Sequence, residues 1–315
     1  MDPKTLELLK KKPEKGKIKT FDQAFEFACK VRPSWNIHRA KKTQAENVRR
    51  NFKQFQEIAG VNVPLEIMDT TFITIVRDRI KEDRGWDNKT VNAFLSFIRT
   101  VFEEASAAGL VKDVPRVHRL PISGGRTEWF TQDQVEELCK TAKSYEDNPL
   151  ADIMLFAAYT GLRSQELRLL RARDFDFRHE RPFINVGGTA DTATKTDLSG
   201  VSWRTVPIAD RILPLAHRIV DGVSLEKRVF GEMFPNRQII ARRFERARDL
   251  VMYHDKTITR MHKFKSLRDT FGTWQCAAGV PLIQVSRIMG HTDTKQTLKY
   301  VHNTMDYVVN CGGAI

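Results

Sequence analysis

Apolar residues recur every three or four positions through most of the first 109 residues, a pattern that predicts a bundle of helices. The first helix begins near Phe21 and ends at Pro33, because proline has no amide hydrogen for a helix interior. Further helices are predicted over about 38–59, 70–83 and 88–109, with Asn88 as the N-cap of the last and Gly109 as its end. Their apolar stripes are Val48, Phe52, Phe55 and Ile58; Phe72, Ile75, Val76 and Ile80; and Val91, Phe94, Leu95, Ile98 and Phe102.

The helical periodicity fails between Leu110 and Thr127, where prolines and a Ser-Gly-Gly run are typical of a linker. A chain of 315 residues is long enough for two domains with separate cores. The predicted parts are a basic tail at 1–19, a helical domain at 20–114, a linker at 115–126 and a second domain at 127–315.

In the second domain, Thr131 and Gln134 fit a capping box, and the apolar run from Ala151 to Tyr159 predicts a buried helix. Two antiparallel strands, at 193–196 and 203–208, flank a polar turn and place Lys195 near a hairpin tip, and 182–186 begins the strand region. Most of the chain after Arg211 is helical. The expected fold class is therefore mainly α with a small antiparallel β-sheet in the C-terminal domain, an α+β arrangement.

The net charge of +13 and the pI of about 9.6 indicate a polyanionic partner. Nucleic acid is favoured over a membrane, because no run approaches about 18 apolar residues and no basic amphipathic helix has a Trp and Leu face. The cysteines are far apart and form no CxxC pair, which predicts free thiols in a reducing, cytoplasmic compartment and no zinc site. They are Cys29, Cys139, Cys276 and Cys311.

Two basic segments are candidate DNA-contacting surfaces. One is the polar face of the second predicted helix, and the other lies within 239–253. The candidate residues are Arg39, Lys41, Lys42, Arg49, Arg50 and Lys53 on the first, and Arg242 and Arg243 on the second. A solvated face is the alternative, but the density of charge on the first segment favours contact with a DNA backbone. The tail at 1–19 has the same two interpretations.

The last quarter of the chain contains a tight turn at Gly290-His291 and a short polar helix that ends at Tyr300. Further upstream, Arg163 directly follows a buried helix and the glycine turn at Gly161. An arginine in such a place is costly unless it is paired or functional. A second arginine, Arg268, lies within a predicted helix.

These segments resemble the motifs of the tyrosine recombinase (phage integrase) family. The resemblance is strong across residues 160–302 and covers the N-terminal bundle by architecture only. The matching segments are Thr160–Leu167 for the first arginine box, Lys195 with Arg204–Pro207 for the hairpin lysine and its strand, Lys265–Gly272 for the second arginine box, and Met289–Tyr300 for the last box.

The resemblance implies a site-specific DNA recombinase in which Tyr300 is the nucleophile and forms a 3′-phosphotyrosyl intermediate. Arg163 and Arg268 are suited to bind the non-bridging phosphate oxygens. A guanidinium group forms bidentate, charge-assisted hydrogen bonds with such oxygens and neutralises the charge gained in the transition state. No metal or other cofactor is expected, and ATP is not needed because the bond energy is kept. Lys195 suits the general acid, and the family implies a hydrogen bond from His291 to the phosphate.

Lys265 departs from the family pattern, which usually has histidine at this position. A lysine offers positive charge and a donor but is no proton shuttle at neutral pH, so we expect Lys265 to stabilise the phosphate. His262 is an alternative source of the histidine function, or else a surface or core residue. Glu166 is expected to brace an arginine or the backbone. Tyr307 is a rival nucleophile, but it lies seven residues too late.

The resemblance implies a core DNA-binding domain at 20–114 and a catalytic domain at 127–315. The expected partner is double-stranded DNA with paired recombination sites, bound by a homo-tetramer in the cytoplasm and nucleoid of a prokaryotic host. An accessory DNA-bending protein is compatible with this interpretation, and the short tail favours a simple core site. The segment 305–315 is either a contact with a neighbouring protomer or a frayed tail. Two alternative functions stay open, a type IB topoisomerase and a catalytically inactive DNA-binding regulator.

Overall fold

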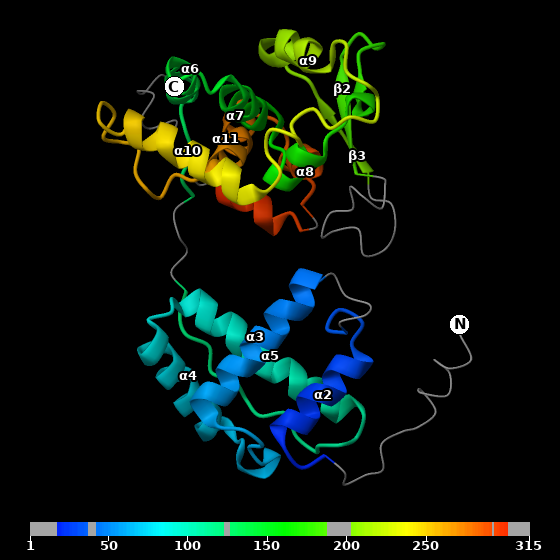
Figure 1. Cartoon of the computed structure of the whole chain (residues 1–315), viewed down its shortest axis with the longest axis vertical. Helices are drawn as coiled ribbons and strands as arrows, with labels where there is room; N and C mark the ends of the chain where they lie inside the picture. Colours follow the sequence, from blue (N-terminus) through cyan, green and yellow to red (C-terminus); the bar gives the residue numbers. More distant parts are fainter. Residues whose placement is uncertain (1–17, 37–41, 123–126, 188–202, 292, 302–315) are drawn as a thin grey trace, which may run out of the picture. The chain divides into compact units, whose positions relative to one another are not determined.

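The computed structural model describes residues 18–36, 42–122, 127–187, 203–291 and 293–301. The chain divides into two compact units, Met1–Gly124 and Gly125–Ile315 (Figure 1). Both units are mainly helical, and the second also contains a small antiparallel sheet. The predicted fold class is therefore confirmed. Within the described residues, no helix is both long enough and apolar enough to cross a membrane.

The first unit is a helical bundle with α5 in contact with each of the other helices. Its helices are α2 (Phe21–Val31), α3 (Lys42–Ala59), α4 (Thr70–Arg84) and α5 (Asn88–Ala107). Aromatic rings from three of them form much of the core, as in the stack of Phe25 on Phe52, with ring centroids 3.9 Å apart. The apolar stripes of the sequence thus point into one shared interior.

One predicted helix start was wrong by a residue. Asp87, and not Asn88, is the N-cap of α5, since its carboxylate accepts a hydrogen bond from the Thr90 amide at 2.7 Å. Asp and Asn are comparably good N-caps, so the sequence does not show which of the neighbours Asp87 and Asn88 caps the helix. The Asn88 side chain instead donates to the Pro121 carbonyl at 2.8 Å.

The non-helical segment after α5 is packed against the first unit. The buried Asn92 amide bonds both backbone groups of Leu120, donating to the carbonyl at 2.9 Å and accepting from the amide at 2.8 Å. Val114, Val117 and Leu120 also rest on the core of this unit. The residues expected to be the start of a linker are therefore held on α5 as far as Leu120.

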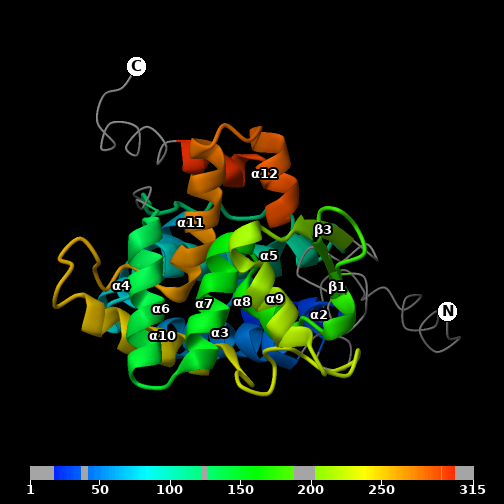
Figure 2. The ribbon, with the colours of Figure 1, turned by 90° about the horizontal axis from the view of Figure 1, so that it is seen from above.

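The second unit places long helices beside a small sheet, and α6 and α7 lie side by side (Figure 2). Helix α11 packs on α7, α10 and α12. The helices are α6 (Gln132–Ser144), α7 (Asn148–Thr160), α8 (Ser164–Leu169), α9 (Leu213–Val220), α10 (Arg237–Val251), α11 (Phe264–Ala277) and α12 (Leu282–Met289). The capping box of Thr131 and Gln134 opens α6 as predicted.

The sheet contains three strands in the order β1-β2-β3, and both pairs are antiparallel. The strands are β1 (Phe175–Asp176), β2 (Phe183–Gly187) and β3 (Trp203–Pro207). Arg204 lies opposite Val186 and Val206 lies opposite Ile184. Because residues two apart share a face, Arg204 lies on the same inward face as the buried Val206. The predicted strand at 193–196 lies outside the described residues.

We predict that Asn92→Ala loosens the segment that ends at Leu120. The change leaves two backbone groups without their partners, at a cost of about 1–3 kcal/mol. Hydrogen exchange should show faster exchange of the Leu120 amide, with a lower unfolding temperature. The control is Asn88→Ala, which removes one exposed hydrogen bond to Pro121 and should change little. Equal protection of Leu120 in wild type and Asn92→Ala would contradict this role.

Candidate active site

The centre of the site is Glu166, a carboxylate whose side chain is 2% exposed. It pairs with Arg163 at 2.9 Å, Arg204 at 2.7 Å and Arg268 at 3.8 Å, and it also accepts from the Arg163 amide at 2.8 Å. Burial opposes ionisation of Glu166 most strongly, but the three guanidinium groups outweigh it and hold its pKa below the usual value. An ionised Glu166 on α8 therefore links Arg163, at the N-cap of α8, with Arg204 of β3 and Arg268 of α11.

The same three arginines bind successive carbonyl groups at the end of α12. Arg204 donates to the Ile288 carbonyl at 2.6 Å. Arg268 donates to the Met289 carbonyl at 2.5 Å, and Arg163 to the Gly290 carbonyl at 2.8 Å. The last carbonyls of a helix lack partners within it and carry partial negative charge. The arginines supply both the missing hydrogen-bond donors and a compensating positive charge. They therefore attach the turn before His291 to the rest of the site.

Two glycines make this approach possible. Gly161 ends α7 with φ of +65°, and a Cβ there would lie 2.4 Å from the Phe271 ring on α11. Its carbonyl accepts from Arg268 at 2.6 Å. Gly290 ends α12 with φ of +66°, and a Cβ there would lie 2.8 Å from the Arg204 guanidinium. A side chain at either position would be strained by the backbone; at Gly161 it would displace the Phe271 ring, and at Gly290 it would displace Arg204.

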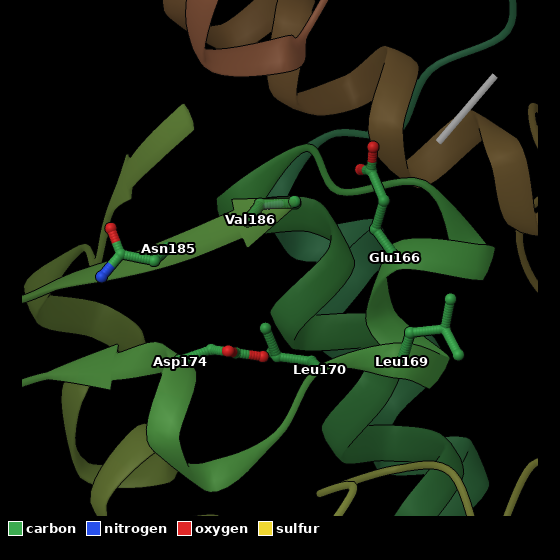
Figure 3. A pocket seen from close by; sticks show the side chains of 7 residues that line it. Glu166, Leu169, Leu170, Asp174, Asn185 and Val186 are labelled. Carbon is green, nitrogen blue, oxygen red and sulfur yellow. The ribbon is translucent and has the colours of Figure 1, made fainter. Parts of the chain in front are cut away.

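Glu166 and Asp174 both line one small pocket, but their carboxylates have different partners. Leu169, Leu170 and Asp174 line the pocket, and the Glu166 carboxylate points away from Leu170 and Asp174 (Figure 3). Asp174 accepts from the Arg171 amide at 2.8 Å instead. Arg163 pairs with Glu166, the carboxylate three residues after it.

His291 follows directly on this turn. Its Nδ1 lies 2.7 Å from the Thr297 hydroxyl, and its ring is parallel to that of Tyr300 with centroids 6.3 Å apart. Burial, and then the positive charges of Arg268 and Arg163, lowers the pKa of His291 to about 4. The imidazole is therefore neutral at neutral pH, and Nδ1 is the ring nitrogen that contacts Thr297.

Tyr300 is fully buried, within a helical stretch at 295–301. Its hydroxyl donates to Oδ1 of Asp269 at 2.8 Å. Its ring lies against Gly272, where a Cβ would come within 2.6 Å of it. Asp269 and Gly272 share one face of α11, so that helix seats both ends of the tyrosine. Burial and the Asp269 carboxylate raise the pKa of Tyr300, which leaves it a neutral phenol in this state.

Two lysines complete the surroundings of Asp269. Lys299 donates to Oδ1 at 2.7 Å, and its ammonium lies 4.6 Å from the centroid of the Tyr300 ring. Lys265 lies four residues before Asp269 on α11, with its Nζ 3.4 Å from Oδ2. Lys265, which stands where the family usually has histidine, is thus paired with Asp269. The same carboxylate accepts the hydrogen bond from Tyr300.

The structure brings together most of the predicted site residues. Arg163, Arg268 and His291 meet around the end of α12, and Lys265 and Tyr300 meet at Asp269. Lys195 and the rival Tyr307 lie outside the described residues. His262 is elsewhere, buried against Phe130 with its Nε2 3.6 Å from Glu128. Its contacts therefore do not support the idea that it replaces the family histidine.

The candidate DNA-contacting residues fall into three groups. Arg49, Arg50 and Lys53 are exposed along α3, and Arg242 is exposed on α10. Arg243 is already engaged by Asp147 and by the Phe234 ring, 4.5 Å from its guanidinium. Arg39 and Lys41 lie outside the described residues, as does the Lys42 side chain.

The sequence left three contributors without a role. Arg204 was noted only as part of a strand motif, although its alternation with Val206 signalled an inward side chain. Asp269 and Lys299 lie beside predicted site residues, but no spacing connects them to the Tyr300 hydroxyl. Within the described residues, no group of three or more His, Cys, Asp or Glu side chains is arranged to hold a metal ion.

The geometry agrees with a comparison of the sequence with known families. Residues 128–306, more than half of the chain, match the phage integrase family. The chain belongs to the phage integrase family. It is accordingly a tyrosine recombinase, an enzyme of site-specific DNA recombination. A topoisomerase or an inactive regulator is not favoured.

Two relatives and one solved structure illustrate the family's range. The tyrosine recombinase XerC-like protein of Caldanaerobacter subterraneus subsp. tengcongensis is 25% identical over 80% of this chain and 71% of its own length. The integrase of Escherichia phage 186 is 24% identical over 70% of this chain, which spans only 58% of that relative. The integrase of the transposon Tn1549, solved with a circular intermediate DNA, shares the recombinase fold with a TM-score of 0.74, 18% identity, and coverage of 90% of this chain and 95% of that one.

We predict that Glu166→Gln destabilises this recombinase by about 3–5 kcal/mol, because it leaves the buried Arg268 and the half-buried Arg163 and Arg204 without their carboxylate. Glu136→Gln is the control, since its pair with Arg211 is exposed and should contribute at most about 1 kcal/mol. The measurement is denaturant unfolding of both variants beside wild type.

The effect of Glu166→Gln should also depend on pH. The pKa of Glu166 is lower in the folded protein than in the unfolded chain. Its contribution is therefore fully present above the unfolded value of about 4.3 and is lost as the pH falls through the lower folded value. A gap between wild type and Glu166→Gln that does not shrink on acidification would contradict the assignment.

We predict that the His291 imidazole titrates near pH 4 in the DNA-free recombinase, because burial and two arginines disfavour its charged form. Since the folded pKa lies below the unfolded value of about 6.5, the neutral ring favours folding above that value. This contribution is lost as the pH falls towards the folded pKa. Nitrogen chemical shifts of the ring provide the measurement, and an ordinary titration near pH 6.5 would contradict its burial beside the arginines.

Proposed function

We propose that this recombinase cleaves and rejoins DNA with Tyr300 as the nucleophile, through a 3′-phosphotyrosyl intermediate that needs neither metal nor ATP. The observation that carries the assignment is the position of Tyr300, which hydrogen-bonds the residue next to Arg268 and lies beside His291. Hydroxyl, guanidinium and imidazole groups are the components that attack on a phosphodiester requires.

Arg163 and Arg268 bind the scissile phosphate in this proposal. Burial and the neighbouring Arg163 lower the pKa of Arg268 to about 10, which still leaves it protonated at neutral pH. A guanidinium has five N–H donors, so each arginine can keep its carbonyl partner in α12 and still donate to a phosphate oxygen. The charge gained in the transition state is then met by groups already in position, without a metal ion.

His291 and Lys195 have complementary proton roles. The neutral His291 donates a hydrogen bond to a non-bridging oxygen and gains basicity as the negative phosphate arrives. Lys195 protonates the leaving 5′-oxygen. Lys265 contributes positive charge beside Asp269, which reduces repulsion between that carboxylate and the phosphate.

The partner is double-stranded DNA carrying paired recombination sites, bound by a homo-tetramer. The helical unit acts as the core DNA-binding domain and the second unit as the catalytic domain. Exposed Arg49, Arg50 and Lys53 on α3 support phosphate contacts from the first unit, and Arg242 supports them from the second. The phage and transposon origins of similar proteins favour a mobile element acting in the cytoplasm and nucleoid of a prokaryotic host. An accessory DNA-bending protein is compatible with this scheme.

We predict that DNA becomes covalently attached to Tyr300 when the protein is expressed in a bacterial host carrying its element. Tyr300→Phe should abolish the adduct, because it removes only the attacking oxygen, while DNA binding persists. Tyr253→Phe is the matched control, since Tyr253 is 72% exposed and should leave the adduct unchanged. Denaturing recovery of protein–DNA complexes provides the measurement, and sequencing of the attached DNA identifies the site.

An adduct that survives in Tyr300→Phe would remove Tyr300 from the mechanism. Absence of any adduct from wild type would favour the inactive regulator. A duplex carrying the recovered site then separates the two enzymatic outcomes. Recombination between two such sites is expected, whereas relaxation of a single supercoiled circle without exchange would indicate a topoisomerase.

A further inference from the structure

Asp269 has contacts that the phosphate-binding role of its neighbours does not explain. It is 4% exposed, so its charge lies in a place where unpaired carboxylates are rarely found. Oδ1 receives hydrogen bonds from the Tyr300 hydroxyl at 2.8 Å and from Lys299 at 2.7 Å. Oδ2 lies 3.4 Å from Lys265. A buried carboxylate is thus held directly on the attacking oxygen by two ammonium groups.

We propose that Asp269 is a catalytic residue, the group that accepts the proton of Tyr300 as the tyrosine attacks DNA. The proposal rests on the proposed role of Tyr300 as nucleophile. A general base must lie within hydrogen-bond reach of the proton that it removes, and Asp269 already meets this condition. The neutral phenol must also lose its proton during the attack. If the Tyr300 oxygen kept its proton while bonding to phosphorus, it would carry a positive charge and become strongly acidic.

The step balances in both directions. In cleavage, the Tyr300 oxygen bonds to phosphorus, its O–H bond breaks and the proton passes to Oδ1 of Asp269. The bond from phosphorus to O5′ breaks, and the leaving oxygen takes a proton from the general acid, for which Lys195 is the candidate. In rejoining, the 5′-hydroxyl attacks and returns its proton to that acid, while Asp269 returns its proton to the departing tyrosine.

The charges around Asp269 favour a role as proton acceptor over a role in which it only holds Tyr300 in place. A lone carboxylate would repel the phosphate, but Lys265 and Lys299 offset its charge from two sides. Lys299 also donates to Oδ1, but a carboxylate oxygen has two lone pairs, so Oδ1 can accept from Lys299 and from Tyr300 together. The titratable groups around the pair are Lys265, Arg268 and Cys276 on α11, Lys299 beside the tyrosine, and His291 at the end of α12. None of the others accepts the Tyr300 hydrogen bond in the described structure.

The test uses the full chain and a synthetic duplex carrying the DNA sequence recovered on Tyr300. Asp269→Asn keeps the size and one acceptor oxygen but is a very poor base, and Asp269→Glu restores the carboxylate. The control is Asp133→Asn, which changes an exposed carboxylate at the start of α6. Duplex binding is measured first, to show that each variant is folded and competent.

Single-turnover cleavage by Asp269→Asn is expected to fall by about 10²–10⁴-fold, the range of a lost general base. Asp269→Glu should recover part of the rate, and Asp133→Asn should match wild type. The Asp269→Asn rate should rise with pH, since the proton must now leave to hydroxide. Asp269→Asn should lose as much rate on a duplex with a bridging sulfur in place of O5′ at the cleavage site. The thiolate leaves without a proton, so this duplex reports only on the attack by Tyr300.

Two results would overturn the proposal. Cleavage by Asp269→Asn at the wild-type rate or faster would show that Asp269 merely holds Tyr300 away from DNA. Recovery of the full rate with the bridging-sulfur duplex would place Asp269 on the leaving-group side. Both results presuppose a wild-type adduct that Tyr300→Phe abolishes, so failure of the proposed function would be seen before these comparisons begin.

Discussion

The site depends on one buried carboxylate. Glu166 would be costly to bury alone, and it is tolerated because guanidinium groups from three separate elements surround it. Those guanidinium groups in turn satisfy the terminal carbonyls of α12, which carry partial negative charge. The carboxylate therefore connects α8, β3, α11 and α12 in a single network, and the turn before His291 takes its position from that network.

This arrangement organises positive charge before DNA is bound. Three arginines face one carboxylate, so the cluster keeps an excess of positive charge, which suits the proposed binding of a phosphate. Groups that are already oriented need little reorganisation during the reaction, which is the main advantage of an electrostatic site over bulk water. Gly161 and Gly290 are part of this arrangement, because side chains there would meet Phe271 and Arg204.

The DNA-free state keeps its reactive groups neutral. Burial and nearby arginines favour the uncharged imidazole of His291, and burial together with Asp269 favours the phenol form of Tyr300. Tyr300 is fully buried, so its hydroxyl is also shielded from solvent. A negative phosphate bound beside the imidazole, as proposed, would favour the protonated form of His291.

The sequence by itself determined the helical elements, the α+β class and the family motifs, because helix periodicity, caps and motif spacing are local properties of the chain. The pair of Lys265 and Asp269 was also within reach, as residues four apart share a helix face. Only the tertiary structure decided that Arg204 joins Arg163 at Glu166 and that Asp269 holds Tyr300. Arg163 and the Gly290 carbonyl are 127 residues apart, and contacts over such separations depend on how packed helices and strands meet, which local spacing does not encode.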